Sequence, residues 1–182
     1  TLGLCALASD TLAEDFSDVI SKTLRFQRAA SESKLEIDNV DGSIRVEGYD
    51  GDEIIVRIDR RIWARNAEKM ALAKEEVELD VYERSSGIVL YIDAPYRAPD
   101  GSINWQGQKK RGYGVTMNFI VRLPESASVD LKTVNNGDID VVGVHGDYRV
   151  NNINGDVEMS GLRGSGRVYA LNGKVEVAFD EN

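Results

Sequence analysis

Acidic side chains recur at matching positions in the C-terminal third of this chain, where they could bind a metal ion or take part in acid–base chemistry. They alternate with apolar residues in two similar segments, as Asp138, Asp140, Asp156 and Glu158. Stacked carboxylates could hold Ca²⁺, which takes about six to eight oxygen ligands. The alternative is a solvated outer face that keeps a sheet soluble. Lys174 replaces the aspartate in a third copy, which breaks the ladder, so we expect no metal site.

The same carboxylates could act as acids or bases, as paired carboxylates do in polysaccharide-cleaving enzymes. Each one, however, has the same place in its copy, which indicates a structural role. His145 is the only histidine, and alone it makes neither a metal site nor a catalytic triad. We therefore expect no catalytic residue and no cofactor. A polysaccharide-active β-helix enzyme is kept as an alternative.

The segment 95–114 is the best candidate for binding a partner or ligand, because long irregular loops in compact domains are often functional. It is basic within an acidic protein, and its aromatic rings could stack on a sugar or anchor another chain. The candidate residues are Arg97, Trp105, Lys109, Lys110, Arg111 and Tyr113. The alternative is a hairpin tip whose tryptophan folds back onto the domain.

Charge and length narrow the functional classes. The chain has 182 residues and a net charge of −9, which argues against general binding to nucleic acid or anionic lipid. No apolar run is long enough to span a membrane.

Residues 1–8 are apolar and end in Ala6-Leu7-Ala8, typical of a signal-peptidase site, so we interpret them as the remnant of a secretory signal peptide. Cleavage after Ala8 would remove Cys5, the only cysteine, and with it any thiol chemistry. We expect a secreted, periplasmic or envelope-associated protein.

A glycine repeat is the strongest architectural signal. Gly137, Gly155 and Gly173 are 18 residues apart, each after an asparagine, and further glycines keep matching offsets. A fourth copy begins far upstream at Gly42. A unit of this length must stack on its neighbours to bury an apolar face. The pattern predicts an all-β parallel β-solenoid, right-handed and β-helix-like, with Ile139 in the same row as the equivalent residues of later copies. An antiparallel β-sandwich is the alternative, since Asn-Gly also favours hairpins.

The remaining pattern predicts one solenoid domain over 34–182, preceded by an N-terminal segment at 9–33. That segment reads as a leader or a short helix covering one end of the sheet. Good helix formers after Asn66 predict a helix near 66–76, with Met70 and Ala73 on its apolar stripe. The 95–114 loop then interrupts the strands.

With these parts in place, the chain resembles the bacterial putative-adhesin family, an uncharacterised group of β-helical repeat proteins. The resemblance covers about residues 34–179. It is carried by the segments Leu35–Val46, Ala67–Glu76, Val77–Val81, Val115–Pro124, Asn136–Val141 and Asn154–Met159. The family has no catalytic motif, and the resemblance implies secreted or envelope-anchored proteins, some with relatives in envelope stress sensing.

The sequence therefore predicts a secreted or envelope-associated binding or scaffold module without catalysis, adhesin-like in type. Its expected partner is an envelope component, either a glycan or a protein, with no role for nucleic acid and with self-association through the solenoid ends as an option. A cell-envelope stress-sensing module is the second alternative, beside the polysaccharide-active enzyme.

Overall fold

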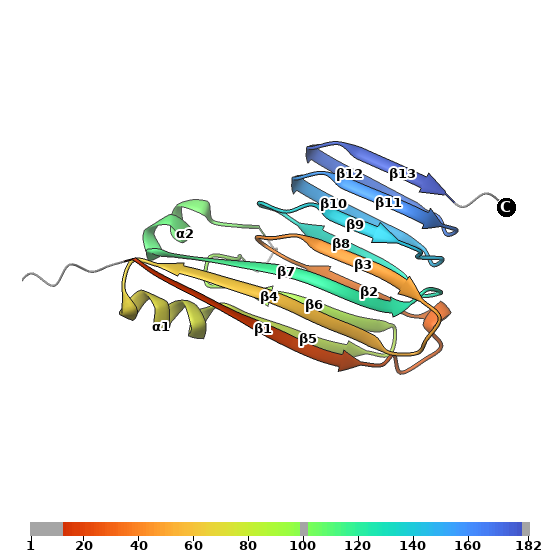
Figure 1. Ribbon diagram of the computed structural model, residues 1–182, viewed down its shortest axis with the longest axis horizontal. Coiled ribbons are helices and arrows are strands. Elements are labelled where there is room, and N and C mark those ends of the chain that lie inside the picture. Colours follow the sequence, from red (N-terminus) through yellow and green to blue (C-terminus); the bar gives the residue numbers. More distant parts are fainter. Residues whose placement is uncertain (1–12, 99–101, 180–182) are drawn as a thin grey trace, which may run out of the picture.

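Two mixed β-sheets face each other across an apolar core (Figure 1). The computed structural model describes residues 13–98 and 102–179. The predicted signal-peptide remnant at 1–8 lies outside these residues. The seven-stranded sheet has the order β1-β4-β7-β3-β9-β11-β13, and the six-stranded sheet has the order β12-β10-β8-β2-β6-β5.

The strands of the first sheet are β1 (Glu14–Leu24), β3 (Ile44–Tyr49), β4 (Ile54–Ala64), β7 (Tyr113–Pro124), β9 (Ile139–Val142), β11 (Val157–Leu162) and β13 (Val175–Phe179). Those of the second are β2 (Lys34–Asp38), β5 (Glu78–Arg84), β6 (Gly87–Asp93), β8 (Ser128–Thr133), β10 (Tyr148–Asn154) and β12 (Gly166–Asn172). The helical elements are a short 3₁₀ turn, η1 (Ala30–Glu32), and two α-helices, α1 (Ala67–Glu76) and α2 (Trp105–Arg111).

The predicted parallel β-solenoid is wrong as the fold of this chain. β1, β4 and β7 pair antiparallel along their lengths, and β5 pairs antiparallel with β6. The fold is a two-sheet β-sandwich, nearer to the alternative, although its sheets are mixed and not purely antiparallel. The prediction failed because it extended the period of the C-terminal repeats to segments that lack it. β4 and β7 have 11 and 12 residues, too long for one side of an 18-residue unit.

The repeats themselves do pair in parallel and in register. Val157 on β11 is the partner of Ile139 on β9 and of Val175 on β13, and the upstream copy joins them, because Ile44 on β3 also pairs with Ile139. Close approach of neighbouring backbones explains why glycine occupies the corners of the repeats. A Cβ at Gly155 would lie 2.1 Å from the Gly137 carbonyl oxygen, so the backbones touch and exclude any side chain.

Side chains also join one repeat to the next. Asn172 Nδ2 donates to Asn154 Oδ1 at 2.8 Å, and Asn154 Nδ2 donates to Asn135 Oδ1 at 3.0 Å. Asn136 does not continue this column, because its φ is 50° and its side chain donates to Asp41 instead. The extra residue at this corner thus shifts the asparagine column by one position.

The segment before β2 contains a strand where a leader or helix was expected. β1 pairs with β4 over all 11 of its residues and forms the edge of its sheet. Asp18 and Arg60 occupy inward-facing positions on these strands, and Arg60 donates from Nε at 2.8 Å and from Nη2 at 2.6 Å to the two carboxylate oxygens. A polar residue on the inward face hides the alternation that would mark the strand.

Helix α1 follows the predicted pattern closely. The Asn66 side chain accepts a hydrogen bond from the Lys69 backbone N–H at 3.0 Å, which caps the helix, and Met70 and Ala73 are buried. The helix packs against β4 and β7 at the same end of these strands as α2 (Figure 1). Within the described residues, no helix is long and apolar enough to cross a membrane.

Candidate functional site

The 95–114 segment is partly helical, and its predicted binding residues do not form one site. α2 begins after Asn104, whose side chain accepts from the Gly107 N–H at 2.8 Å, and ends at Gly112 with φ 74°. Arg97 lies apart from the helix, with its side chain only 2% exposed. Its Nη1 donates to the Ile92 carbonyl at 2.8 Å, and its Nη2 lies 2.8 Å from Asp38 Oδ2. This guanidinium holds the domain together and is not offered to a ligand.

Arg111 and Tyr113 are bound to helix α1. Arg111 Nη1 lies 2.7 Å from both carboxylate oxygens of Glu76, and the Tyr113 hydroxyl donates to the same carboxylate. The hydrogen bond from Tyr113, followed by that from Arg111, lowers the pKa of Glu76. Burial, followed by the Glu76 carboxylate, raises the pKa of Tyr113. These two residues therefore anchor the end of α2.

The other three residues divide into one packed and two free side chains. Trp105 is half-buried against the core, as in the alternative of a tryptophan folded back onto the domain. Lys109 and Lys110 are exposed, and neither makes an ion pair with a described residue. Of the predicted set, only these two lysines present unpaired charge to solvent.

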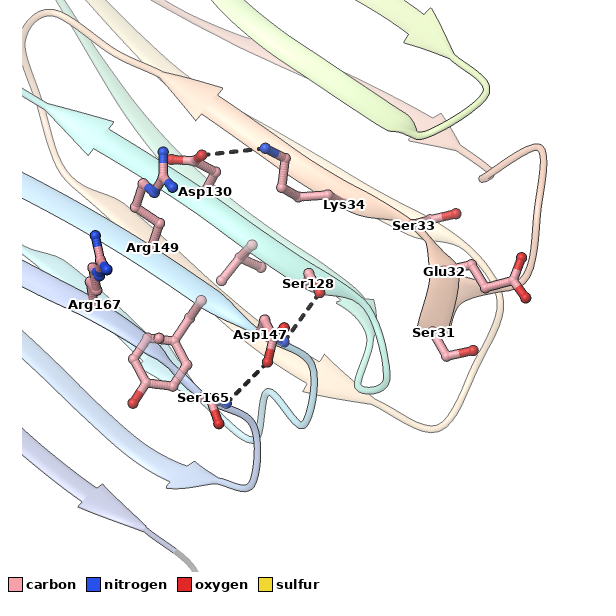
Figure 2. A pocket seen from close by; sticks show the side chains of 13 residues that line it. Ser31, Glu32, Ser33, Lys34, Ser128, Asp130, Asp147, Arg149, Ser165 and Arg167 are labelled. Atoms are coloured by element: carbon pink, nitrogen blue, oxygen red, sulfur yellow. Dashed lines mark hydrogen bonds and ion pairs between the residues drawn. The ribbon is translucent and has the colours of Figure 1, made fainter.

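A groove of about 620 Å³ lies elsewhere, on the outer face of the six-stranded sheet (Figure 2). It crosses the N-terminal ends of four parallel strands, β2, β8, β10 and β12, beside the turn η1. Side chains alternate between the faces of a strand, so the burial of Val129 and Val150 places Asp130 and Arg149 outward. The residues that line it include four serines (Ser31, Ser33, Ser128 and Ser165) and three cations (Lys34, Arg149 and Arg167).

The cations of the groove differ in their partners. Lys34 Nζ lies 3.3 Å from Asp130 Oδ2 and 3.6 Å from Glu36 Oε2, so its charge is compensated. Arg149 and Arg167 are register partners on β10 and β12. Neighbouring strands lie about 4.8 Å apart, so the two side chains leave the sheet next to each other. Arg149 also has Asp130 of β8 as a register partner, but that carboxylate is paired with Lys34. Neither arginine forms an ion pair with a described residue, and their like charges repel each other unless an anion binds between them.

Asp147 in the groove and two aspartates of the repeats form hydrogen bonds between neighbouring strands or turns. Asp147 Oδ1 accepts from the Ser165 backbone N–H at 3.2 Å, and the Asp147 N–H donates to Ser128 Oγ at 3.1 Å (Figure 2). In the opposite sheet, Asp138 and Asp156 each accept from the backbone N–H 18 residues later, at 2.8 Å. For Asp138 and Asp156, two of the four repeat carboxylates, the predicted structural role takes this physical form. These two oxygens accept hydrogen bonds from backbone amides of the next repeat.

Sequence reasoning missed the groove, although the signal was present. Arg149 and Arg167 are 18 residues apart, the period of the glycine repeat, so the stacking that aligns the repeats also aligns the two arginines. Lys34 had no such signal, because it reaches the groove through the pairing of β2 with β8.

No family model matches the chain, and no curated protein matches it. By structure the chain is similar to a putative cell adhesion protein from Clostridium sporogenes ATCC 15579, with 8% identity, a TM-score of 0.43, and coverage of 90% of this chain and 100% of that chain. It is also similar to a putative adhesin from Bacteroides fragilis NCTC 9343, with 8% identity, a TM-score of 0.27 and coverage of 90% and 94%. A putative adhesin from Parabacteroides merdae ATCC 43184 has 7% identity, a TM-score of 0.25 and coverage of 90% and 96%. These structural neighbours are bacterial and share the adhesin description, but at such identities and TM-scores the chain is not assigned to a family.

Proposed function

We propose that this protein is a non-catalytic binding module of the cell envelope, and that the groove across β2, β8, β10 and β12 receives an acidic oligosaccharide. The observation that carries the proposal is the pair Arg149 and Arg167, side by side and without an ion-pair partner among the described residues. A guanidinium matches the geometry of a carboxylate or phosphate with two parallel hydrogen bonds. Two neighbouring guanidinium groups suit one shared oxyanion, or two on successive sugar units.

The rest of the groove supports a sugar and not a bare anion. Serine hydroxyls both donate and accept hydrogen bonds, so Ser31, Ser128 and Ser165 can pair with sugar hydroxyls. The overall charge of −9 works against adsorption of polyanions in general. Binding must then depend on the local arginine pair, which makes the site selective.

The absence of catalysis is part of the proposal and rests on how the carboxylates are engaged. Asp147 accepts a hydrogen bond from a backbone N–H, and Asp130 pairs with Lys34. Glu32 also lines the groove, but it stands alone on η1, without a second unengaged carboxyl among the described lining residues to form an acid–base pair. A general acid or base would need a carboxyl free to exchange a proton with the substrate. We therefore propose recognition without turnover.

The test is calorimetric titration with oligogalacturonate, its neutral galactose counterpart, and short polyphosphate as the phosphate-bearing probe. The wild type should bind oligogalacturonate or polyphosphate, but not the neutral chain. Arg149→Gln with Arg167→Gln should weaken binding at least tenfold, because each lost charged hydrogen bond contributes about 1–2 kcal/mol. Tighter binding of the carboxylate or of the phosphate probe identifies the acidic group of the ligand.

A matched control removes two arginines from the opposite sheet. Arg45 on β3 and Arg61 on β4 are exposed and make no ion pair with a described residue. Arg45→Gln with Arg61→Gln changes the net charge by the same amount and should leave affinity unchanged. Equal losses in both double variants, or no binding of either acidic probe by the wild type, would contradict the proposal. Cleavage of the probe during the titration would contradict the non-catalytic assignment.

A further inference from the structure

A second hollow, separate from the groove, surrounds the only strongly exposed tryptophan of the described residues. Trp63 lies on the outward side of β4, and 45% of the residue is exposed. A hollow of about 380 Å³ beside it is lined by Trp63, Arg65, Gln108, Lys109, Tyr113 and Gly114. Its volume is that of a small-ligand pocket. These residues come from β4 and the position directly after it, from α2 and from β7, which meet at one end of the seven-stranded sheet (Figure 1).

The hollow exists because the strand position opposite Trp63 has no side chain. Trp63 and Gly114 are register partners on β4 and β7, and a Cβ at Gly114 would meet nothing within 4 Å. On the other flank, the register partner of Trp63 is Asp15 on β1. The indole is therefore uncovered on the side of β7 and α2, away from that carboxylate.

Positive charge is concentrated on the open side. Arg65 and Lys109 line the hollow, and neither makes an ion pair with a described residue. The Arg65 side chain passes the end of α2, with Cδ 3.1 Å from the position of a Cβ on Gly112. An exposed ring flanked by two uncompensated cations suits a ligand that is apolar on one face and acidic at its edge.

The walls of the hollow are held in place before any ligand arrives. Tyr113 is buried, and its hydroxyl is bound by Glu76 of α1. Gln108 is held within α2, where its backbone N–H donates to the Asn104 carbonyl oxygen at 3.0 Å. Because the walls are already ordered, ligand binding loses less conformational entropy.

We propose that this hollow binds one acidic sugar ring, with its C–H face stacked on the Trp63 indole and its carboxylate bound by Arg65 and Lys109. A sugar ring has the required shape, since it combines a flat apolar face with an acidic edge. The inference uses none of the groove residues, and it stands or fails separately from the function proposed for the groove.

The chain offers a direct reporter, because it contains only two tryptophans. Trp105→Phe leaves Trp63 as the single indole, so its fluorescence reports the hollow alone. Titration with digalacturonate should change this emission in a saturable way, and the neutral digalactoside should bind at least fivefold more weakly. Arg65→Gln with Lys109→Gln should abolish that preference. Calorimetry gives a second readout that does not depend on the Trp105 variant. It compares the double variant Arg149→Gln with Arg167→Gln, which lacks the groove arginines, before and after addition of Trp63→Ala, a substitution at an exposed position.

Two further variants define the location. Gly114→Val places a side chain in the hollow, where its Cβ meets no heavy atom within 4 Å. It should reduce affinity at least tenfold while the circular dichroism spectrum is retained. Arg149→Gln with Arg167→Gln should leave the Trp63 signal unchanged, which separates this site from the groove. No response of Trp63 to digalacturonate, or a Trp63 response that survives Gly114→Val, would overturn the inference.

Discussion

Arg111 Nη1 lies 2.7 Å from both carboxylate oxygens of Glu76, joining the end of α2 to the end of α1. Tyr113, the first residue of β7, donates to the same carboxylate. One side chain thus fixes three elements that are separated by up to 37 residues in sequence. These bonds to Glu76 anchor the C-terminal end of segment 95–114, which the sequence suggested was an irregular loop. The hollow beside Trp63 depends on this anchoring, because Tyr113 is one of its walls.

Replacing Glu76 should loosen this junction. Glu76→Gln loses the ion pair with Arg111 and weakens the bond from Tyr113. We expect a destabilisation on the order of 1 kcal/mol, because the pair is partly exposed and screened by water. Urea denaturation measures it, and Glu75→Gln, an exposed neighbour, is the control. Equal unfolding midpoints for Glu76→Gln and the wild type would show that the junction contributes nothing.

Acid should destabilise the fold through two carboxylates. The hydrogen bond from Arg60 lowers the pKa of Asp18, and the bond from Tyr113 lowers the pKa of Glu76. Below about pH 4 the unfolded chain protonates these groups before the folded protein does, so it binds more protons. Their stabilisation is complete above about pH 5 and is lost as the pH falls through the folded pKa values.

Urea midpoints at a series of pH values from 7 to 3 measure this loss. A variant with Asp18→Asn and Glu76→Gln should show a smaller change in stability across the acid range than the wild type. Asp15→Asn removes a carboxylate that makes no ion pair with a described residue, and it should keep the full acid dependence. The same acid dependence in all three proteins would refute the assignment.

Glycine at the repeat corners should be irreplaceable. Gly155→Ala places a methyl group 2.1 Å from the Gly137 carbonyl oxygen, at a φ of 158°, so the repeats must separate there. We expect a loss of about 3 kcal/mol or more, as in other overpacked sites. Gly114→Ala is the matched control, since its methyl group meets open space. Thermal denaturation tests this prediction. Near-identical melting temperatures for the two variants would show that the repeats accommodate the methyl group without loss of stability.

The last pair of strands should open first. β12 and β13 each pair on one side only, and Val175, Val177 and Phe179 on β13 are exposed, whereas the equivalent Val157 and Met159 on β11 are buried. Local opening is easiest where few apolar contacts hold the backbone. Hydrogen exchange read by mass spectrometry should therefore be fastest in β12 and β13 and slowest in β2 and β8. Strong protection of β13 would mean that another surface covers it.

Local features of the fold could be predicted from sequence, while the arrangement of the sheets could not. Asn66, Met70 and Ala73 mark helix α1 because capping and apolar spacing are written in adjacent residues. The repeat likewise indicated that Ile139 and Val157 share a row. The antiparallel half has no such mark. Its edge strand, β1, is held by the ion pair between Asp18 and Arg60, which are 42 residues apart. The sequence next to either residue does not predict that pairing.

The groove could not be located from the sequence for a related reason. Composition predicted ligand binding by the basic and aromatic residues of 95–114. In the structure, however, Arg97 forms an ion pair with Asp38, and Arg111 forms one with Glu76. Whether an arginine is free depends on carboxylates that the fold brings from elsewhere. Arg149 and Arg167 were less conspicuous in sequence, but the stacking of repeats places them together without a partner among the described residues.

The most direct test of the central claim is a crystal structure of the protein with bound oligogalacturonate. The account predicts sugar density in the groove over β8, β10 and β12, with a carboxylate within hydrogen-bond distance of both Arg149 and Arg167. A groove left empty while the oligosaccharide is bound at another surface would contradict it.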